Sequence, residues 1–381
     1  MLKISSKLPD VGVTIFSVMT ALANEHRAIN LSQGFPDFDV APELIERVTA
    51  YMNAGANQYA PMPGLPVLRE KIARKVSGCY GFDYDPVTEI TVTSGATEAI
   101  FAAVAATVHR DDEVLIFEPA YDAYAPIVTL NGGIPRYIQL KTPDYRIDWD
   151  EVRDALGPKT RLLILNTPHN PTGSILTTQD IDALKQILEN TDTMILSDEV
   201  YEHIIFDGSR HESIARYPEL AARSFVVSSF GKTYHTTGWK IGYCLAPEAL
   251  SRELQRVHQF LTFSSNTPIQ HAYADFLDKQ GLYLELGAFY QEKRDLFLRL
   301  MQGSRFTPIA CSGTYFQLMS YAPISTEADI DFSRRITIEH GVASIPVSVF
   351  YNDRQDHHVI RFCFAKKDET LEKAAEKLCR I

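Results

Sequence analysis

Short apolar runs that alternate with helical segments constrain the fold of this chain more than any other feature. Thr177 and Asp180 match a capping box, which indicates a helix start between two of these runs. Short buried strands separated by helices are typical of βαβ units. The pattern therefore predicts an α/β fold with a mostly parallel central sheet and helices on both faces, and ligands of such sheets gather beyond the carboxyl ends of the strands. The predicted strands are residues 89–93, 113–117, 161–166, 193–197 and 224–228.

The chain has 381 residues, which is too long for one small core. Its opening segment carries an amphipathic patch and ends in a loop signature. From about residue 281 the pattern changes to a long polar helix, shorter strands near 314–319 and 359–364, and a last amphipathic helix. We therefore predict an N-terminal arm over residues 1–35 that joins the small domain, a large ligand-binding domain over 36–280, and a small C-terminal α+β domain over 281–381.

Composition excludes several classes of partner. The net charge of −11 argues against nucleic acid, because a polyphosphate backbone calls for clustered lysine and arginine. No stretch reaches the ~18 apolar residues of a membrane span, and the N-terminus carries no signal peptide. The five cysteines are scattered and form no CxxC pair, so neither a disulfide frame nor a zinc site is expected. These features predict a soluble cytoplasmic protein without a metal centre.

Lys232 lies in a run of small and hydroxyl residues that begins at Ser228, and a second cation, Lys240, follows eight positions later. An amine in such surroundings suits a Schiff base beside a bound phosphate. The alternative is a solvated surface charge, which is the fate of most lysines.

The loop over residues 93–98 joins a predicted strand to a predicted helix and contains Ser94, Gly95, Ala96 and Thr97. Small residues let backbone N–H groups approach an anion, and a helix N-terminus adds partial positive charge. The loop is neither a GxGxxG fingerprint nor a P-loop. A plain strand-to-helix turn is the alternative.

Two polar residues follow strand ends. Asn170 lies in a loop stiffened by prolines and a glycine at residues 168–173, where the alternative is a rigid turn. Asp198 ends an apolar strand, and a buried carboxylate needs a partner, such as a protonated pyridine nitrogen. Tyr201, three residues on, can reach the phenolic oxygen of the same ring. The alternative is a helix cap by Asp198, with Tyr201 filling the core.

Two further residues suit a bound ring and a substrate. Tyr121 follows a strand end and can stack on a heteroaromatic ring, although core packing is the alternative. Arg361 interrupts an apolar strand, where a guanidinium is costly unless a carboxylate meets it. That carboxylate belongs either to a bound amino acid or to an internal Asp or Glu.

Taken together, these motifs resemble the class I/II aminotransferases, pyridoxal-phosphate enzymes of the aspartate aminotransferase fold (fold type I). The likeness runs from the segment 32–36 through Arg361, and is closer to the methionine and kynurenine aminotransferase branch that includes glutamine transaminase K. One departure is Lys240, since many members carry arginine there, and a lysine lacks the planar fork.

The resemblance implies specific roles. Lys232 holds pyridoxal 5′-phosphate as a Schiff base, Asp198 pairs with the ring nitrogen, Asn170 and Tyr201 bond the ring oxygen, and Tyr121 stacks on the ring. The phosphate contacts Gly95, Ala96, Thr97, Ser229 and Lys240, and Tyr59 reaches the phosphate of a neighbouring subunit, which implies a homodimer with shared active sites. Arg361, Asn170 and Gly34 hold the substrate carboxylate, and Phe16 and Tyr315 are expected among the pocket walls, with Phe263 and Phe350.

The implied activity is transfer of an amino group from a large uncharged amino acid (methionine, aromatic, kynurenine or glutamine type) to a 2-oxo acid by a ping-pong mechanism. A C–S β-lyase on the same fold would share Lys232, Asp198 and Arg361, so it remains an alternative. A non-catalytic regulator of this fold would usually lose the lysine or append a basic module, and neither is seen in this sequence.

Overall fold

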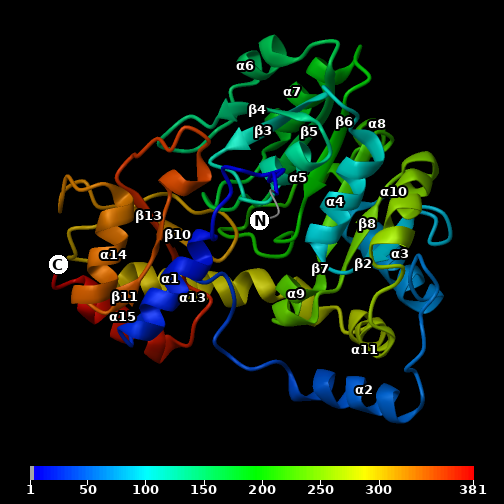
Figure 1. Ribbon diagram of the computed structural model, residues 1–381. Helices are drawn as coiled ribbons and strands as arrows, with labels where there is room; N and C mark the ends of the chain where they lie inside the picture. Colours follow the sequence, from blue (N-terminus) through cyan, green and yellow to red (C-terminus); the bar gives the residue numbers. More distant parts are fainter. Residues whose placement is uncertain (1–3) are drawn as a thin grey trace.

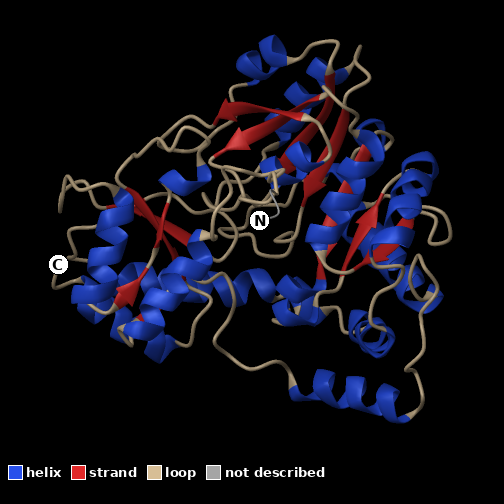
Figure 2. Cartoon of the chain, in the orientation of Figure 1, coloured by secondary structure: helices blue, strands red, loops and turns tan. Residues whose placement is uncertain are grey.

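A seven-stranded sheet forms the centre of the computed structural model, which describes residues 4–381 (Figures 1 and 2). The strand order is β2-β8-β7-β6-β5-β3-β4. All neighbouring pairs are parallel except the two that β8 makes. The strands are β2 (Ile90–Thr93), β3 (Glu113–Glu118), β4 (Ile134–Gln139), β5 (Thr160–Asn166), β6 (Met194–Asp198), β7 (Ser224–Ser229) and β8 (Gly242–Leu245). The predicted mostly parallel sheet is confirmed.

Alternate side chains of each central strand enter different cores, because successive residues of a strand point to opposite faces. In β5, Leu162 and Ile164 pack with α4 and α10, whereas Leu163 and Leu165 belong to the core that contains α3 and α7. Helices therefore cover both faces, as predicted. The helices of this part are α2 (Pro42–Asn53), α3 (Pro66–Tyr80), α4 (Ala96–Thr107), α5 (Tyr124–Leu130), α6 (Trp149–Ala155), α7 (Thr178–Leu188), α8 (Pro218–Ala221), α9 (Phe230–Thr233), α10 (Glu248–Leu261) and α11 (Thr267–Leu277).

The capping box at the start of α7 is present. The side chain of Thr177 accepts from the backbone of Asp180, and the Asp180 carboxylate accepts from the backbone of Thr177. These two bonds satisfy donors that a helix N-terminus otherwise leaves unpaired. The helix begins where the sequence predicts it.

A smaller antiparallel sheet lies beside the main one, in the order β12-β13-β10-β9. It has its own core, which includes Phe316, Phe362 and Leu371. Its elements are α12 (Gly281–Leu284), α13 (Leu286–Leu300), β9 (Thr307–Pro308), β10 (Phe316–Ser320), α14 (Asp329–Glu339), β12 (Ile345–Pro346), β13 (Val359–Cys363) and α15 (Asp368–Leu378). An α+β assembly near the C-terminus was expected, and the exact domain boundaries remain a prediction.

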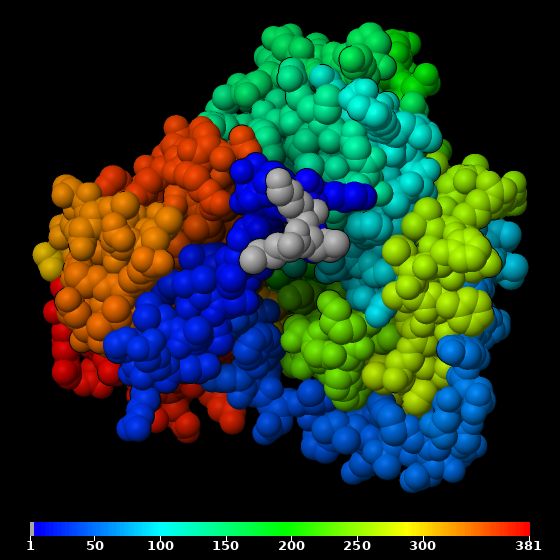
Figure 3. Space-filling view, viewed as in Figure 1, coloured from blue at the N-terminus to red at the C-terminus, as the bar shows by residue number. Residues whose placement is uncertain are grey.

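The N-terminal segment packs with these C-terminal elements. Strand β1 (Ile29–Asn30) pairs in parallel with β11 (Val342–Ala343), and α1 (Ile15–Glu25) precedes it. In Figure 3 this dark blue segment lies between the orange and red C-terminal elements and the cyan and green elements of the main sheet. Residues 1–3 of the predicted arm lie outside the described residues. No helix within residues 4–381 is long and apolar enough to cross a membrane.

Candidate active site

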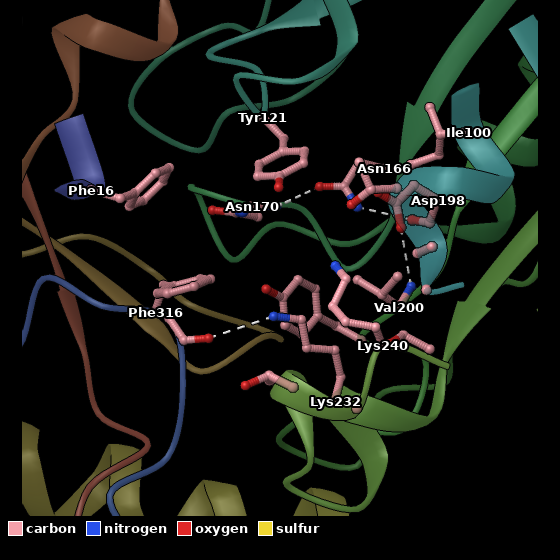
Figure 4. Close-up of a pocket in the computed structure, with 18 of the residues that line it drawn as sticks. Phe16, Ile100, Tyr121, Asn166, Asn170, Asp198, Val200, Lys232, Lys240 and Phe316 are labelled. Carbon is pink, nitrogen blue, oxygen red and sulfur yellow. Dashed lines mark hydrogen bonds between the residues drawn. The ribbon is translucent and has the colours of Figure 1, made fainter. Parts of the chain in front are cut away.

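The carboxyl ends of three neighbouring strands open into a cavity of about 260 Å³. Asn166 ends β5, Asp198 ends β6 and Ser229 ends β7, and the parallel register pairs Asn166 with Asp198. In the view of Figure 4, Tyr121 and Lys232 lie on opposite sides of the cavity, with Asp198 at one end and Phe16 and Phe316 at the other. The sheet edge thus collects polar groups from distant parts of the sequence.

Most of the predicted site residues line this cavity. They are Phe16, Gly34, Gly95, Ala96, Thr97, Tyr121, Asn170, Asp198, Tyr201, Ser229, Lys232, Lys240 and Arg361. Four predicted residues are not part of the lining: Phe263, which is 41% exposed, Phe350, which is buried beside Arg361, and the two tyrosines Tyr315 and Tyr59. Tyr315 is fully buried and contacts the Lys232 amine, whereas Tyr59 is 83% exposed and packs its ring on Phe263, with centroids 5.5 Å apart.

Lys232 belongs to the short helix α9, directly after β7. Its side chain faces the cavity, and its amine donates to the hydroxyl oxygen of Tyr315 at 3.0 Å and toward the carbonyl of Gly34 at 3.5 Å. Burial lowers the pKa of this amine to about 8, although Cys363 and Asp198 oppose the shift. Lys232 is therefore a partly buried amine within reach of the neutral form at physiological pH, and not a solvated surface charge.

Asp198 lies 5% exposed at the end of β6. Its Oδ2 accepts from the hydroxyl of Tyr124 at 2.6 Å, and its Oδ1 accepts from the backbone N–H of Val200 at 3.3 Å. Burial raises the pKa of this carboxyl to about 6, and these hydrogen bonds offset part of the rise. The residues that follow form a turn, so Asp198 is not a helix cap. Its negative charge is available to a cationic ligand in the cavity.

A hydrogen-bonded chain connects the loop after β5 to the strand of the small sheet. The side chain of Asn166 accepts from the backbone N–H of Asn170 at 2.7 Å and donates to the carbonyl of Asp198 at 2.9 Å. Asn170 Oδ1 in turn accepts from Arg361 Nη1 at 2.6 Å. Asn166 therefore holds the backbone of Asn170, and Arg361 fixes the direction of its side chain.

Arg361 is 1% exposed on β13, and no carboxylate among residues 4–381 forms an ion pair with it. Its guanidinium carbon lies 3.8 Å from the ring centroid of Phe316 and 5.3 Å from those of Phe16 and Phe350. Its Nε has no hydrogen-bond partner in the described chain, and burial lowers the pKa of the guanidinium to about 10. A buried cation in this state suits an anionic ligand, and the internal ion pair that was the alternative is not found.

Helix α4 begins at the cavity without a side-chain cap. Its N-cap Gly95 has φ 79° and ψ 168°, a backbone region essentially restricted to glycine. A Cβ built there would lie 3.4 Å from Cε and Nζ of Lys240, so the lysine packs against this turn. Unsatisfied N–H groups at a helix start and an adjacent ammonium form a site for a phosphate-like anion.

Sequence reasoning missed several residues of the cavity, notably Asn166, Tyr124 and Phe316. The sequence could have identified Asn166 as a site residue, because it ends an apolar strand as Asp198 does. Tyr124 carried no such signal, since its contact with Asp198 joins residues 74 positions apart.

Comparison with known proteins gives concordant matches over nearly all of the chain. A family model described as aminotransferase class I and II matches residues 26–378. A methionine aminotransferase of Escherichia coli is 51% identical over 377 residues, which cover 99% of this chain and 98% of that protein. A kynurenine–oxoglutarate transaminase 1 of Homo sapiens is 32% identical over 395 residues, covering 94% and 93% of the two chains.

Solved structures agree with these matches. One from Escherichia coli, described with a methionine aminotransferase function, superimposes with a TM-score of 0.98 at 50% identity, and all of both chains is covered. An N-succinyldiaminopimelate aminotransferase from Mycobacterium tuberculosis gives a TM-score of 0.96 at 36% identity, covering 99% of this chain and 100% of that one.

Proposed function

Because this chain belongs to the class I and II aminotransferases, we propose that it moves the amino group of a large uncharged amino acid, of which methionine is the first candidate, to a 2-oxo acid. The observation that carries this proposal is the buried Arg361, whose guanidinium lacks a carboxylate partner in the described chain and lies among aromatic rings beside the Lys232 amine.

The family depends on pyridoxal 5′-phosphate, and the residues of the cavity suit that cofactor. The Lys240 ammonium and the backbone N–H groups at the start of α4 would bind its phosphate. Asp198 offers a buried carboxylate for its ring nitrogen, and Asn170 and Tyr201 offer donors for its ring oxygen. Tyr121 provides an aromatic ring on the opposite side of the cavity from Lys232.

When bound, the cofactor supplies an electron-withdrawing ring that stabilises negative charge at the substrate Cα. The Lys232 amine would hold the cofactor, and the amino group of the substrate would free that amine for proton transfer. The freed Nζ would act as general base toward the substrate Cα–H and would then carry that proton as an ammonium. Arg361 and Asn170 fix the substrate carboxylate, which orients the Cα–H bond. A second 2-oxo acid reverses the sequence, so ping-pong kinetics are expected.

The aromatic rings around Arg361 favour one class of substrate side chain. Phe16, Phe316 and Phe350 surround the guanidinium that would hold the substrate carboxylate. An apolar aromatic wall favours a large uncharged side chain, and thioether sulfur makes favourable contacts with aromatic rings. The methionine aminotransferase of Escherichia coli, at 51% identity, supports methionine as the donor.

A homodimer is part of the proposal. Tyr59 is exposed beside Phe263, away from the cavity of its own chain. Clustered exposed apolar side chains mark surfaces that another chain covers, and Phe260, Leu261 and Phe263 are all exposed in the same stretch of chain. We infer that Tyr59 reaches the phosphate site of a second copy.

Two measurements test the proposed function. The visible spectrum of the purified protein should contain a chromophore that borohydride reduces onto Lys232, and peptide mass spectrometry identifies the modified residue. Turnover of methionine should depend on an added 2-oxo acid. Release of pyruvate from a cysteine conjugate, without such dependence, would instead identify a C–S β-lyase.

A further inference from the structure

The Lys232 amine has a tyrosine partner that neither cofactor binding nor binding of the substrate carboxylate requires. Tyr315, fully buried ahead of strand β10, lies 3.0 Å from Lys232 Nζ through its hydroxyl oxygen. The same hydroxyl donates to the carbonyl of Gly34 at 2.6 Å. Gly34 O also lies 3.5 Å from Lys232 Nζ. These three groups come from the N-terminal segment, the main sheet and the small sheet.

The numbers of hydrogen-bond donors and acceptors determine which group donates in this contact. A phenol has one hydrogen, and that of Tyr315 is directed to Gly34 O, so its oxygen acts as an acceptor toward Lys232. A neutral amine has two N–H groups and one lone pair. The two acceptors, Tyr315 Oη and Gly34 O, match the two N–H groups and leave the lone pair free to accept a proton.

Packing holds the phenol in place. The ring of Tyr315 meets the ring of Tyr201 edge to face, with centroids 5.1 Å apart, and that of Tyr290 at 5.6 Å. A Cβ at Gly34 would lie 2.8 Å from Cζ of Phe316, so glycine is needed for this close approach. The positions of both acceptors are therefore set by buried neighbours.

We propose that Tyr315 is a positioning residue for the free Lys232 amine, and that it holds the lone pair in the orientation needed to take the proton from the substrate Cα. This inference rests on the proposed aminotransferase reaction. It replaces the expectation that Tyr315 forms a wall of the substrate pocket.

Removal of the Tyr315 oxygen has a predictable electrostatic effect. An acceptor stabilises the ammonium form more than the neutral amine, so its loss lowers the pKa of Lys232 below about 8. The other titratable groups around this amine are Asp198, Lys240, Arg361, Cys363 and Tyr201. All of them remain in a Tyr315→Phe variant, so the shift reports on the phenol itself.

The first test does not depend on turnover. The cofactor-free full-length protein is labelled at Lys232 with trinitrobenzenesulfonate over a range of pH, and the modified peptide is quantified by mass spectrometry. The wild-type protein should give a midpoint near pH 8. Tyr315→Phe should move the midpoint down by about half a pH unit or more. An unchanged midpoint would overturn the assignment.

The second test uses the holoenzyme with methionine and a 2-oxo acid. Tyr315→Phe should lower kcat by about 10- to 100-fold, the range of a misplaced general base, with KM changed little because Arg361 and Asn170 are intact. Tyr290→Phe is the matched control, because its buried hydroxyl has no hydrogen-bond partner in the described chain and its ring touches Tyr315. It should retain wild-type kcat.

The outcomes separate this proposal from the proposed function. A higher KM at constant kcat would make Tyr315 a substrate wall, and equal losses in both variants would make it structural; either result overturns the inference. If the wild-type protein lacks transamination while the labelling midpoint still shifts in Tyr315→Phe, the function proposed above fails but the contact stands.

Discussion

Three charged side chains, Lys232, Asp198 and Arg361, enclose one small cavity, and none of them has an ion-pair partner among residues 4–381. Burial of a charge without a counter-ion is unfavourable, and here it shifts the pKa of each group toward its neutral form. We propose that a bound ligand supplies the opposite charge that each of these residues lacks. The same three charges that would bind the ligand therefore lower the stability of the protein when no ligand is bound.

Replacement of Arg361 by methionine should separate the effect of this residue on stability from its effect on activity. The variant removes an unpaired buried cation, so the cofactor-free protein should melt at the same or a higher temperature. Its kcat/KM for methionine should fall about 100-fold or more, because the substrate carboxylate loses a charge-assisted bond of ~2–4 kcal/mol. Calorimetry and steady-state kinetics measure both effects. A large drop in Tm would instead indicate a structural role.

Tyr124→Phe tests the support of Asp198. The variant removes the phenol that donates to Asp198 Oδ2, so the pKa of Asp198 should rise above about 6 and pairing with a cationic ring nitrogen should weaken. We expect cofactor affinity to fall about 10-fold, since a bond to a charged group contributes ~1.5–3 kcal/mol. Equilibrium dialysis measures this affinity. Tyr84→Phe, whose buried hydroxyl lacks a partner in the described chain, should leave it unchanged.

Two short connections determine the geometry of the site at the scale of elements. One is the turn from β2 into α4, and the other is the loop from β5 to α7 that carries His169 and Asn170. Both follow carboxyl ends of parallel strands, where backbone groups no longer needed by the sheet become available to a ligand. We expect a substitution in either connection to alter the stability of the protein.

Gly95→Ala should disturb the first connection. Its φ and ψ are essentially accessible to glycine alone, so the substitution should cost about 1–3 kcal/mol in stability. It should also weaken cofactor binding, because the added methyl group meets Lys240. Gly78→Ala is the control, since Gly78 is inside α3 with free space around it, and this change should raise stability by about 0.5–1 kcal/mol. Urea denaturation compares the two variants.

His169 should make the second connection sensitive to acid. Burial lowers the pKa of His169 to about 3, whereas the unfolded chain takes up this proton near pH 6.5. The unfolded state therefore binds more protons between these values, and the free energy of unfolding falls as pH drops, by up to about 1.4 kcal/mol per pH unit. His169→Asn should flatten the pH dependence of urea midpoints between pH 6.5 and 4.5. The exposed His357→Asn should not.

At the scale of the whole molecule, the site is assembled from parts that lie far apart in sequence. Gly34 comes from the N-terminal segment, Lys232 from the main sheet and Arg361 from the small sheet. The relative placement of the two sheets therefore determines the distance between the amine and the guanidinium. The proposed homodimer extends this dependence to a second chain.

Phe260→Asp tests the dimer. Phe260 and Tyr59 are 86% and 83% exposed, and Tyr59 packs on Phe263. A carboxylate at residue 260 should oppose burial of this surface, so sedimentation velocity should show a shift from dimer to monomer, with loss of transamination. Val87→Asp, at an exposed apolar position elsewhere, should retain the dimer. A monomeric wild-type protein would contradict the proposal directly.

The sequence predicted the fold well because its evidence is local. Alternation of apolar runs and helices depends on neighbouring residues, so the parallel sheet and the capping box at Thr177 both followed from it. Polar residues at strand ends, such as Asp198, were found for the same reason. Asn166 could have been predicted in the same way, because it also ends an apolar strand. It pairs with Asp198 in the adjacent strand, which explains why both side chains reach the cavity.

By itself, the sequence determined which chemical groups are present and at which ends of the strands they lie. Only the tertiary structure decided which groups touch. Tyr315 was expected in the pocket wall, yet it accepts from Lys232 across 83 positions, and Tyr124 donates to Asp198 across 74. Such contacts depend on how separate elements pack together, and the pattern of apolar residues along the chain does not predict them.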